Sequence, residues 1–359
     1  MTFGVIIIDL DPNLFTIGPF TLTWHGIFSV LGILATIRLG AWLARRHDGV
    51  DPGAVYDAAF WMVILGLIGA RLLYVWENWR YFAVNGWVRV FYVTEGGISQ
   101  WGGIFGAMLG LLAWTRRPPK RVAVPDLSEQ PEKLRLLRWL ASEGESVRNG
   151  DPIVELAADN REISVEAPAS GRLTDLVEAG TELELDHTLA RIDSRLSFWT
   201  LLDAAGPAAL LGLAIGRIGD VINGEHHGTV TNLPWGVDYV NQHTLGQPDR
   251  IVHPEVAYEM ILCLGLLAIL LPFNSRLKRA LPNGVTGLIY LSLYAIGRFW
   301  LSYDRADQII ALGLRQAQLA CVVMVVLALV ATPFLFRHRR RAEGEPAAPG
   351  PAPAPAARA

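Results

Sequence analysis

The sequence predicts an all-α polytopic membrane bundle of seven transmembrane helices, interrupted by a small inserted all-β domain. Three observations carry this prediction. Of the 359 residues, 52% are hydrophobic, and seven separate stretches are apolar enough to be spanning helices, which need about 20 residues each. Only 18% of the residues are charged, against about 25% in soluble proteins. Much of this charge falls in one polar segment, in the loops and in the tail.

Three spans are predicted before the polar segment. Residues 22–44 are apolar up to the arginine pair that follows them, and residues 54–76 form a second apolar run. Residues 100–115 form a shorter run that is rich in glycine. Because small residues let neighbouring helices approach closely in lipid, this run is expected to pack tightly within the bundle.

Four further spans are predicted after the polar segment. The first of them is again rich in glycine. The two cysteines, Cys263 and Cys321, lie inside apolar runs, so the sequence excludes a disulfide framework and a cysteine-based zinc site. The four predicted spans are residues 198–218, 254–273, 284–303 and 317–336.

Basic residues alternate from loop to loop. Clusters of Lys and Arg follow the first, third, fifth and seventh predicted spans, whereas the loops between them carry few. Positive charge marks cytoplasmic loops, so the N-terminus is predicted outside and the C-terminus in the cytoplasm. The clusters lie at residues 45–46, 116–121, 276–279 and 337–341.

Charge also limits the partners of the chain. The formal net charge of −3 at pH 7 provides no overall excess of basic residues of the kind that binding to a phosphate backbone needs. We therefore expect no nucleic-acid partner. No motif in the sequence predicts a bound metal or cofactor.

Residues 120–195 differ from the rest of the chain. They are polar, with short alternating apolar runs that are separated by Gly, Asn, Asp and Ser, a pattern typical of strands and turns. The predicted domains are therefore a first bundle part at 1–119, a cytoplasmic β domain at 120–195 and a second bundle part at 196–341. The Ala/Pro-rich residues 342–359 are predicted to be a disordered tail.

The polar segment resembles the biotinyl/lipoyl-carrier family over nearly its whole length. The stretches that carry the resemblance are 124–127, 143–147, 150–152, 165–171 and 189–192. The resemblance implies a barrel-sandwich hybrid, a flattened sandwich of two small sheets. In that family a lysine at a hairpin tip takes the cofactor as an amide, but here Asn160 stands at that position. We therefore expect an unmodified spacer or docking module whose partner is unknown.

Charged residues inside the apolar runs point to a functional site. Each costs roughly 2.5–3.5 kcal/mol on insertion scales, so such residues mark function by default. Arg71, Arg217, Glu259 and Arg298 all fall towards the outer ends of their predicted spans. Several guanidinium groups at one depth suit a phosphate, which arginine binds in a bidentate manner. The alternative is that the arginines extend to the membrane surface.

The same residues lie in motifs that resemble prolipoprotein diacylglyceryl transferases. These motifs are the runs 216–228, 96–103 and 253–259, together with Tyr294 and Arg298. The resemblance covers the chain outside the polar segment and the tail. It implies a seven-span enzyme of the bacterial inner membrane that uses no cofactor. Such enzymes move the diacylglyceryl group of phosphatidylglycerol, a membrane lipid, onto the lipobox cysteine of signal-peptide-bearing pre-lipoproteins, and glycerol phosphate leaves.

The resemblance also implies which residues form the site. Arg217 and Arg298 would stabilise the leaving phosphate, and a nearby base would expose the thiolate of a cysteine whose ordinary pKa is about 8.5. The base is left open: it is a nearby histidine or carboxylate, and the histidine candidates are His25, His226, His227 and His253. The expected catalytic residues are Arg217, Glu225, Arg298, Asp220 and His25. The expected substrate-binding residues are Arg71, Asn223, Gly228, His253, Tyr258, Glu259, Tyr294, Gly102 and Gly103.

Four positions depart from the pattern of that family. Trp101 stands where a histidine is frequent, and His25 stands where the family has tyrosine. Asp220 replaces an asparagine, which adds a charge and removes two donors, so it is expected to change the contacts of Arg217, for instance by pairing with it. Ser302 stands in place of a glutamate one helical turn after Arg298.

Two other functions stay open at this point. The first is a non-catalytic or altered-substrate relative that binds phospholipid or lipoprotein precursors. The second is a transporter subunit, which would require a polar pathway across the whole bundle. The charges identified within the spans lie only towards the outer side, which disfavours the transporter.

Overall fold

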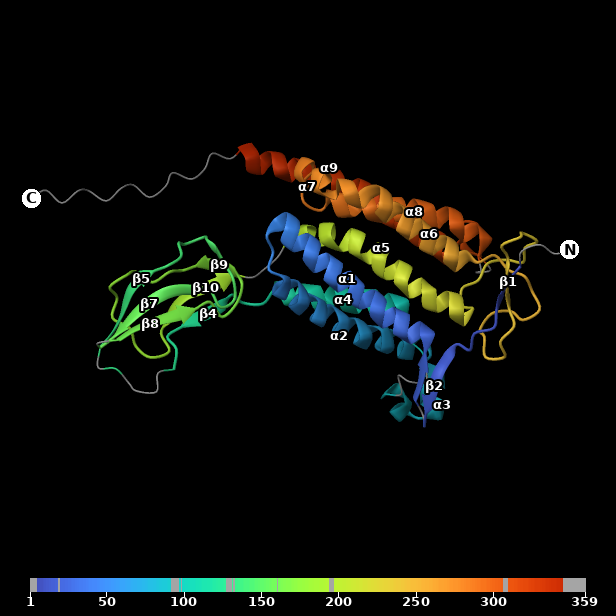
Figure 1. The fold of residues 1–359 in the computed structure, drawn as a ribbon, viewed down its shortest axis with the longest axis horizontal. Helices are drawn as coiled ribbons and strands as arrows, with labels where there is room; N and C mark the ends of the chain where they lie inside the picture. Colours follow the sequence, from blue (N-terminus) through green and yellow to red (C-terminus); the bar gives the residue numbers. More distant parts are fainter. Residues whose placement is uncertain are drawn as a thin grey trace, which may run out of the picture.

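The computed structural model describes residues 5–18, 20–91, 97, 99–126, 131, 133–159, 161–193, 197–305 and 309–344. Figure 1 shows an elongated helical bundle with a β-rich domain attached at one end. The principal helices are α1 (Trp24–Asp48), α2 (Pro52–Glu77), α4 (Gln100–Thr115), α5 (Phe198–Asn223), α6 (Glu255–Leu270), α8 (Val285–Leu301) and α9 (Gln316–Gly344). Shorter helices are α3 (Trp79–Asn85), η1 (Trp87–Phe91), η3 (Leu271–Phe273), α7 (Asn274–Ala280) and η4 (Ser302–Asp304).

Local sequence explains where α1 and α5 begin and end. The side chain of Thr23 caps α1 by accepting a hydrogen bond from the Gly26 N–H, and Ser197 accepts from Trp199 at the start of α5. Gly49 and Gly224 follow the two helices in the left-handed conformation, which glycine adopts without steric cost. These caps fix both ends of the two helices that pack together at the centre of the bundle.

Close packing between helices depends on glycine, as expected from the sequence. The most extensive helix pairs are α1 with α5 and α2 with α4. A Cβ on Gly32 would lie 2.5 Å from the Gly212 carbonyl, and one on Gly102 would lie 2.3 Å from the Gly69 carbonyl. Side chains at these positions would therefore push the helices apart.

Each of the seven predicted apolar runs coincides with a helix. Among the described residues, six helical stretches are long and apolar enough to cross a membrane, and together they make this a multi-pass membrane protein. The exception is α4, which is 16 residues long. That is about 24 Å, less than the hydrocarbon thickness of about 30 Å, so a seventh span stays a prediction.

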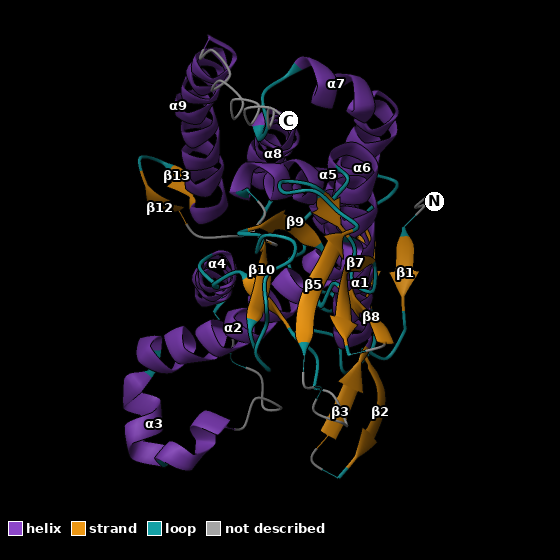
Figure 2. Cartoon of the chain, turned by 90° about the vertical axis from the view of Figure 1, so that its left-hand side faces the viewer, coloured by secondary structure: helices purple, strands orange, loops and turns teal. Residues whose placement is uncertain are grey.

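The polar segment forms two sheets around its own core. The seven strands are β4 (Lys120–Ala123), β5 (Leu134–Trp139), β6 (Ser146–Val147), β7 (Pro152–Ala158), β8 (Arg161–Glu166), β9 (Gly171–Thr174) and β10 (Thr188–Asp193). One sheet has the order β4-β10-β9-β6 and the other β5-β7-β8. Figure 2 shows both sheets from the insert side of the molecule. Ile153, Leu156, Leu173 and Leu189 between the sheets are fully buried.

The two ends of the insert meet beside the bundle. Strand β4 follows α4 after a few residues, and β10, which precedes α5, pairs with β4 so that Ile192 faces Lys120. Asn160, the residue at the modification position, lies outside the described residues. So does the tail from residue 345, whereas the predicted tail residues 342–344 belong to α9.

Short strands lie at the other end of the bundle. The strand β1 (Ile6–Ile8) runs parallel to β11 (Val237–Tyr239), and β2 (Asn13–Ile17) forms a hairpin with β3 (Phe20–Thr23). Strands β12 (Ile309–Ala311) and β13 (Leu314–Arg315) precede α9. Figure 1 shows β1 and β2 at the end of the bundle away from the β domain.

Candidate active site

The last two turns of α5 place the first pair of charged side chains. Arg217 and Asp220 are three residues apart, so they share one face of the helix. Nη1 of Arg217 donates a hydrogen bond to Oδ2 of Asp220. Arg217 lies 19 residues after the start of α5, about 28 Å along the helix axis. The pair is therefore far from the β domain, near the strand-covered end of the bundle.

Glu259 on α6 holds two arginines. Its Oε2 lies 2.9 Å from Nη2 of Arg217, and its Oε1 lies 3.4 Å from Nε of Arg298 on α8. The hydroxyl of Tyr294 donates to the same Oε1 at 2.6 Å. Glu259 is fully buried, and a buried carboxylate needs such partners. The contacts tie α5, α6 and α8 together at one depth.

The network continues from Arg298 to the loop beyond α5. Nη1 of Arg298 donates to Oε1 of the fully buried Glu255. Oε2 of Glu255 lies 3.9 Å from Nη1 of Arg305, whose Nη2 lies 3.4 Å from Nδ1 of His226. Desolvation of the imidazole, followed by the charges of Arg305 and Arg217, lowers the pKa of His226. His226 is therefore neutral at pH 7.

A histidine on α1 completes the other end of the network. Nδ1 of His25 lies 2.7 Å from Oδ1 of Asp220 and 3.8 Å from Oε2 of Glu225. Asp220 thus bridges His25 and Arg217. This confirms the expectation that Asp220 pairs with Arg217. His25 and Asp220 are two of the positions at which the sequence departs from the family pattern. They are 195 residues apart in the sequence, yet they contact each other.

The charges of this network nearly balance, but its hydrogen bonds are incomplete. Three arginines face three buried carboxylates. Nε of Arg217 is buried without a hydrogen-bond partner among the described residues, and so are Oε2 of Glu255 and Oε2 of Glu259. The contact of this last oxygen with Arg217 is an ion pair without hydrogen-bond alignment. One donor and two acceptors are therefore available to a polar ligand.

The loop residues predicted for the site lie beside this network. Asn223 ends α5, and its carbonyl accepts from Leu245 at 2.9 Å. The N–H of Gly228 donates to the carbonyl of His253 at 2.9 Å, and a Cβ on Gly228 would lie 2.6 Å from that of His253. The loop can approach α6 this closely because residue 228 has no side chain. Nδ1 of His253 lies 3.3 Å from the Tyr258 hydroxyl.

Three predicted residues belong to a different pair of helices. The guanidinium of Arg71 on α2 donates to the backbone carbonyls of residues 89, 90 and 97 at 2.7–2.8 Å. It therefore holds η1 and Gly97 against α2. Gly102 packs α4 against α2, as described above, and Gly103 lies one residue further along α4. These contacts of Arg71 and Gly102 link α2 with α4 and with residues 89, 90 and 97.

Two groups of charged residues went unrecognised in the sequence. Glu255 and Arg305 extend the network. The sequence does not single out Glu255, although it lies within the 253–259 motif. The fully buried Glu255 is the acidic partner of Arg298, while Ser302 bonds to the Arg298 carbonyl. At the opposite end of the bundle, Asp203 of α5 binds Lys278. Charge within the spans is therefore not confined to one side.

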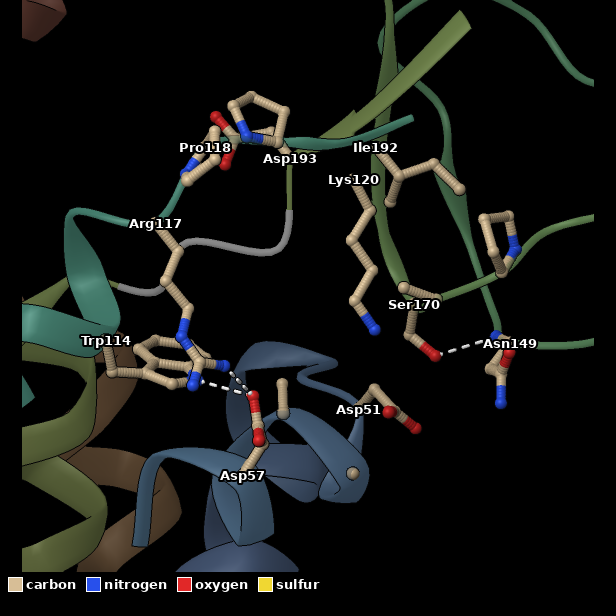
Figure 3. Close-up of a pocket in the computed structure, with 15 residues that line it drawn as sticks. Asp51, Asp57, Trp114, Arg117, Pro118, Lys120, Asn149, Ser170, Ile192 and Asp193 are labelled. Carbon is tan, nitrogen blue, oxygen red and sulfur yellow. Dashed lines mark hydrogen bonds and ion pairs between the residues drawn. The ribbon is translucent and has the colours of Figure 1, made fainter. Parts of the chain in front are cut away.

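Two cavities among the described residues lie away from the network. One of about 320 Å³ separates the β domain from the bundle (Figure 3). In it, Asp57 accepts from Arg117 at 2.7 Å and from the Trp114 indole at 2.8 Å. A second, of about 460 Å³, lies between α5, α7 and α9 and is lined by Trp199, Lys278 and Phe334 among others. Neither is lined by a residue of the network.

Fold and site together define a class of protein: a multi-pass membrane protein with a buried arginine–carboxylate network at one end of its bundle. The family model described as prolipoprotein diacylglyceryl transferase matches residues 12–128 and 187–333. The chain therefore belongs to this family of transferases. A second model, described as biotin-requiring enzyme, matches residues 120–192 and confirms the inserted lipoyl-like domain.

Curated relatives agree with this assignment. A protein of Synechocystis sp. is 26% identical over 321 residues, covering 88% of this chain and 86% of its own. One of Gloeobacter violaceus is 29% identical, covering 89% and 90%. One of Dehalococcoides mccartyi is 27% identical, covering 91% and 93%. Each is named phosphatidylglycerol–prolipoprotein diacylglyceryl transferase.

Proposed function

We propose that this protein transfers the diacylglyceryl group of phosphatidylglycerol to the lipobox cysteine of signal-peptide-bearing pre-lipoproteins and releases glycerol phosphate. The names of the relatives support this reaction. The observation that carries it is the incomplete hydrogen bonding of the network. The headgroup of phosphatidylglycerol has one anionic phosphate and a glycerol with hydroxyl groups. Nε of Arg217, which makes no hydrogen bond among the described residues, suits the phosphate. The Oε2 atoms of Glu255 and Glu259, which lie in ion pairs but accept no hydrogen bond there, suit the hydroxyls.

The reaction assigns a role to each part of the network. The thiolate attacks the glyceryl carbon, the carbon–oxygen bond breaks, and the phosphate oxygen keeps the electron pair. Arg217 and Arg298 stabilise the charge that develops there, as fixed donors do in a water-poor site. Glu259 and Tyr294 position both guanidinium groups. Asp220, Glu225 and His25 lie where the thiol enters.

The surrounding residues are proposed to shape the lipid site. Asn223, Gly228, His253 and Tyr258 form its loop wall. Arg71, Gly102 and Gly103 act less directly: the glycines let α4 pack closely against α2, and Arg71 positions the backbone of residues 89, 90 and 97. This role replaces direct phosphate contact as our proposal for Arg71.

We also propose how the chain lies in the membrane. Helix α4 is the seventh span, and the bilayer thins or the ends of α4 extend to the interface to match its length. The basic loops place the N-terminus outside and the C-terminus in the cytoplasm of a bacterial inner membrane. The domains are then 1–119 and 196–341 in the membrane, with a barrel-sandwich insert at 120–195 in the cytoplasm.

Replacement of the cell's own enzyme tests the function. The chain is expressed in bacteria depleted of their prolipoprotein diacylglyceryl transferase, and lipoprotein maturation is followed by gel mobility. We expect wild-type protein to restore maturation, Arg217→Ala to abolish it, and Arg276→Ala to behave as wild type, since Arg276 is an exposed residue of α7. Membrane-inserted wild-type protein that binds phosphatidylglycerol but restores nothing would support a non-catalytic lipid-binding relative instead.

A further inference from the structure

We propose that His25 is the general base that deprotonates the substrate thiol, and that Asp220 orients it. This inference rests on the proposed function and deepens it by assigning the base. The same site holds four histidines near Arg217 and Arg305, but His25 alone is paired with a buried carboxylate among the described residues.

Packing fixes the position of His25. The residue lies in the first turn of α1, directly after the cap formed by Thr23. A Cβ on Gly219 of α5 would lie 2.7 Å from the Cα of His25. The first turn of α1 therefore lies directly against the last turns of α5, which places the imidazole beside Asp220.

The hydrogen bond to Asp220 sets the tautomer of the imidazole. An ionised carboxylate only accepts, so Nδ1 of His25 donates to Oδ1 of Asp220 at 2.7 Å. Arg217 engages the other oxygen, Oδ2, and keeps the carboxylate ionised and oriented. Nε2 of the neutral imidazole then carries no proton and is the basic atom. This is the arrangement in which a carboxylate orients a histidine base.

Exposure and charge suit the same role. The His25 side chain is 43% exposed while that of Asp220 is 5% exposed, so an incoming thiol reaches the imidazole but not the carboxylate. Asp220 and Glu225 stabilise the imidazolium that forms, whereas Arg217 opposes it. Because two carboxylates and one guanidinium surround His25, the local charge favours the protonated imidazole.

The other histidines are bonded differently. Nδ1 of His226 faces the guanidinium of Arg305, so its proton lies on Nε2, and this atom is a donor. Nδ1 of His253 contacts the Tyr258 hydroxyl. His227 bonds to the backbone carbonyl of Gly228 at 2.9 Å, a neutral group that stabilises an imidazolium less than a carboxylate does.

The proton transfer balances within the reaction. Nε2 takes the proton of the thiol as the sulfur–carbon bond forms and the carbon–oxygen bond of the lipid breaks. The imidazolium then releases that proton to water or to the departing glycerol phosphate. No oxidant, reductant or metal is required for this step.

The alternative role for His25, Asp220 and Glu225 is to bind a cation. One ligand atom from each of His25, Asp220 and Glu225 lies within 4.8 Å of the others. However, the Nδ1–Oδ1 contact is a direct hydrogen bond, and the guanidinium of Arg217 touches the same carboxylate. Both features favour a proton-transfer pair over a bound cation.

The test uses purified full-length protein with phosphatidylglycerol vesicles and a lipobox peptide. We expect His25→Gln to lower kcat at pH 7 by about 100-fold, within the range of general-base catalysis, with lipid binding retained. Its rate should then rise with pH towards the ordinary thiol pKa of about 8.5. Added imidazole should partly restore His25→Ala, which a structural defect would not allow.

His243→Gln is the matched control. His243 makes a similar pair with Asp11, at 2.9 Å, but on the exposed surface. We expect this variant to keep wild-type kcat and pH profile. If His25→Gln matches wild type in kcat and in pH profile, His25 is not the base, but the proposed transferase function stands. If the wild type itself transfers nothing, the proposed function fails. If EDTA abolishes activity and a divalent cation restores it, these residues bind a metal and His25 is not the base.

Discussion

Arg217 of α5 and Glu259 of α6 face each other across the bundle, with Nη2 2.9 Å from Oε2. The same carboxylate also lies 3.4 Å from Nε of Arg298. One fully buried carboxylate therefore contacts two guanidinium groups and joins three helices. Removal of its charge would leave both cations without their shared partner.

Glu259→Gln is accordingly expected to destabilise the protein. Breaking a buried ion pair by removing one partner costs about 3–5 kcal/mol, and we expect a loss of this size in detergent unfolding experiments. Glu225→Gln serves as control, since Glu225 is partly exposed, and it should cost less than about 1 kcal/mol. Equal losses in the two variants would show that the network contributes no particular stability.

Asp203→Asn should destabilise the opposite end of the bundle. Asp203 accepts hydrogen bonds from the backbone N–H groups of Gly284 and Gly287 at 2.8 Å and from Lys278 at 2.7 Å. It thus caps α8 from a neighbouring helix. We expect a loss of about 3 kcal/mol in unfolding experiments. Asp48→Asn should cost less, because Lys278 keeps its contact with Asp203.

Deletion of the insert should leave the bundle folded. The β domain has its own core, and its first and last strands pair with each other. A variant in which a short linker replaces residues 122–194 is therefore expected to insert into the membrane with an unfolding midpoint close to that of the full chain. A large fall in the midpoint would mean that the domain supports the bundle.

The insert should carry no attached cofactor. Asn160 stands at the position where carrier domains have lysine, and its amide nitrogen does not form the required link. Mass spectrometry of the intact protein is expected to give the mass of the unmodified chain. A lipoyl or biotinyl adduct on any residue would contradict this prediction.

His226 should make stability depend on pH. Its pKa is lowered in the fold, chiefly by desolvation and then by Arg305 and Arg217. Below the ordinary value of about 6.5 the unfolded chain therefore binds a proton more readily than the folded chain, and stability falls as the pH falls. We expect a smaller loss of thermal stability between pH 7.5 and 5 for His226→Asn than for wild type. Parallel curves would exclude this contribution.

The helices were the most predictable part of the molecule. Each apolar run became a helix because burial in lipid demands satisfied backbone groups. The motif residues Arg217, Glu259 and Arg298 also converge, because their positions along α5, α6 and α8 place them at one depth.

Lateral neighbours were harder to predict. Depth along a helix does not show which helix lies beside it. The sequence therefore groups Arg71 with Arg217 and Arg298, whereas in the fold the guanidinium of Arg71 donates to the backbone of residues 89, 90 and 97. Glu255 and Arg305 were overlooked because both lie at the ends of helical segments, where charge is expected in any case. Asp203 lies inside the predicted span 198–218, and nothing in the sequence shows that it caps α8.

The pairing of β4 with β10 has a consequence for engineering. Because Lys120 and Ile192 face each other, the chain leaves and re-enters the bundle at nearly one point. Any compact module with adjacent termini satisfies the same geometric demand. A fluorescent protein or an affinity tag fused at this junction would report where the molecule resides while leaving all seven principal helices in their native order.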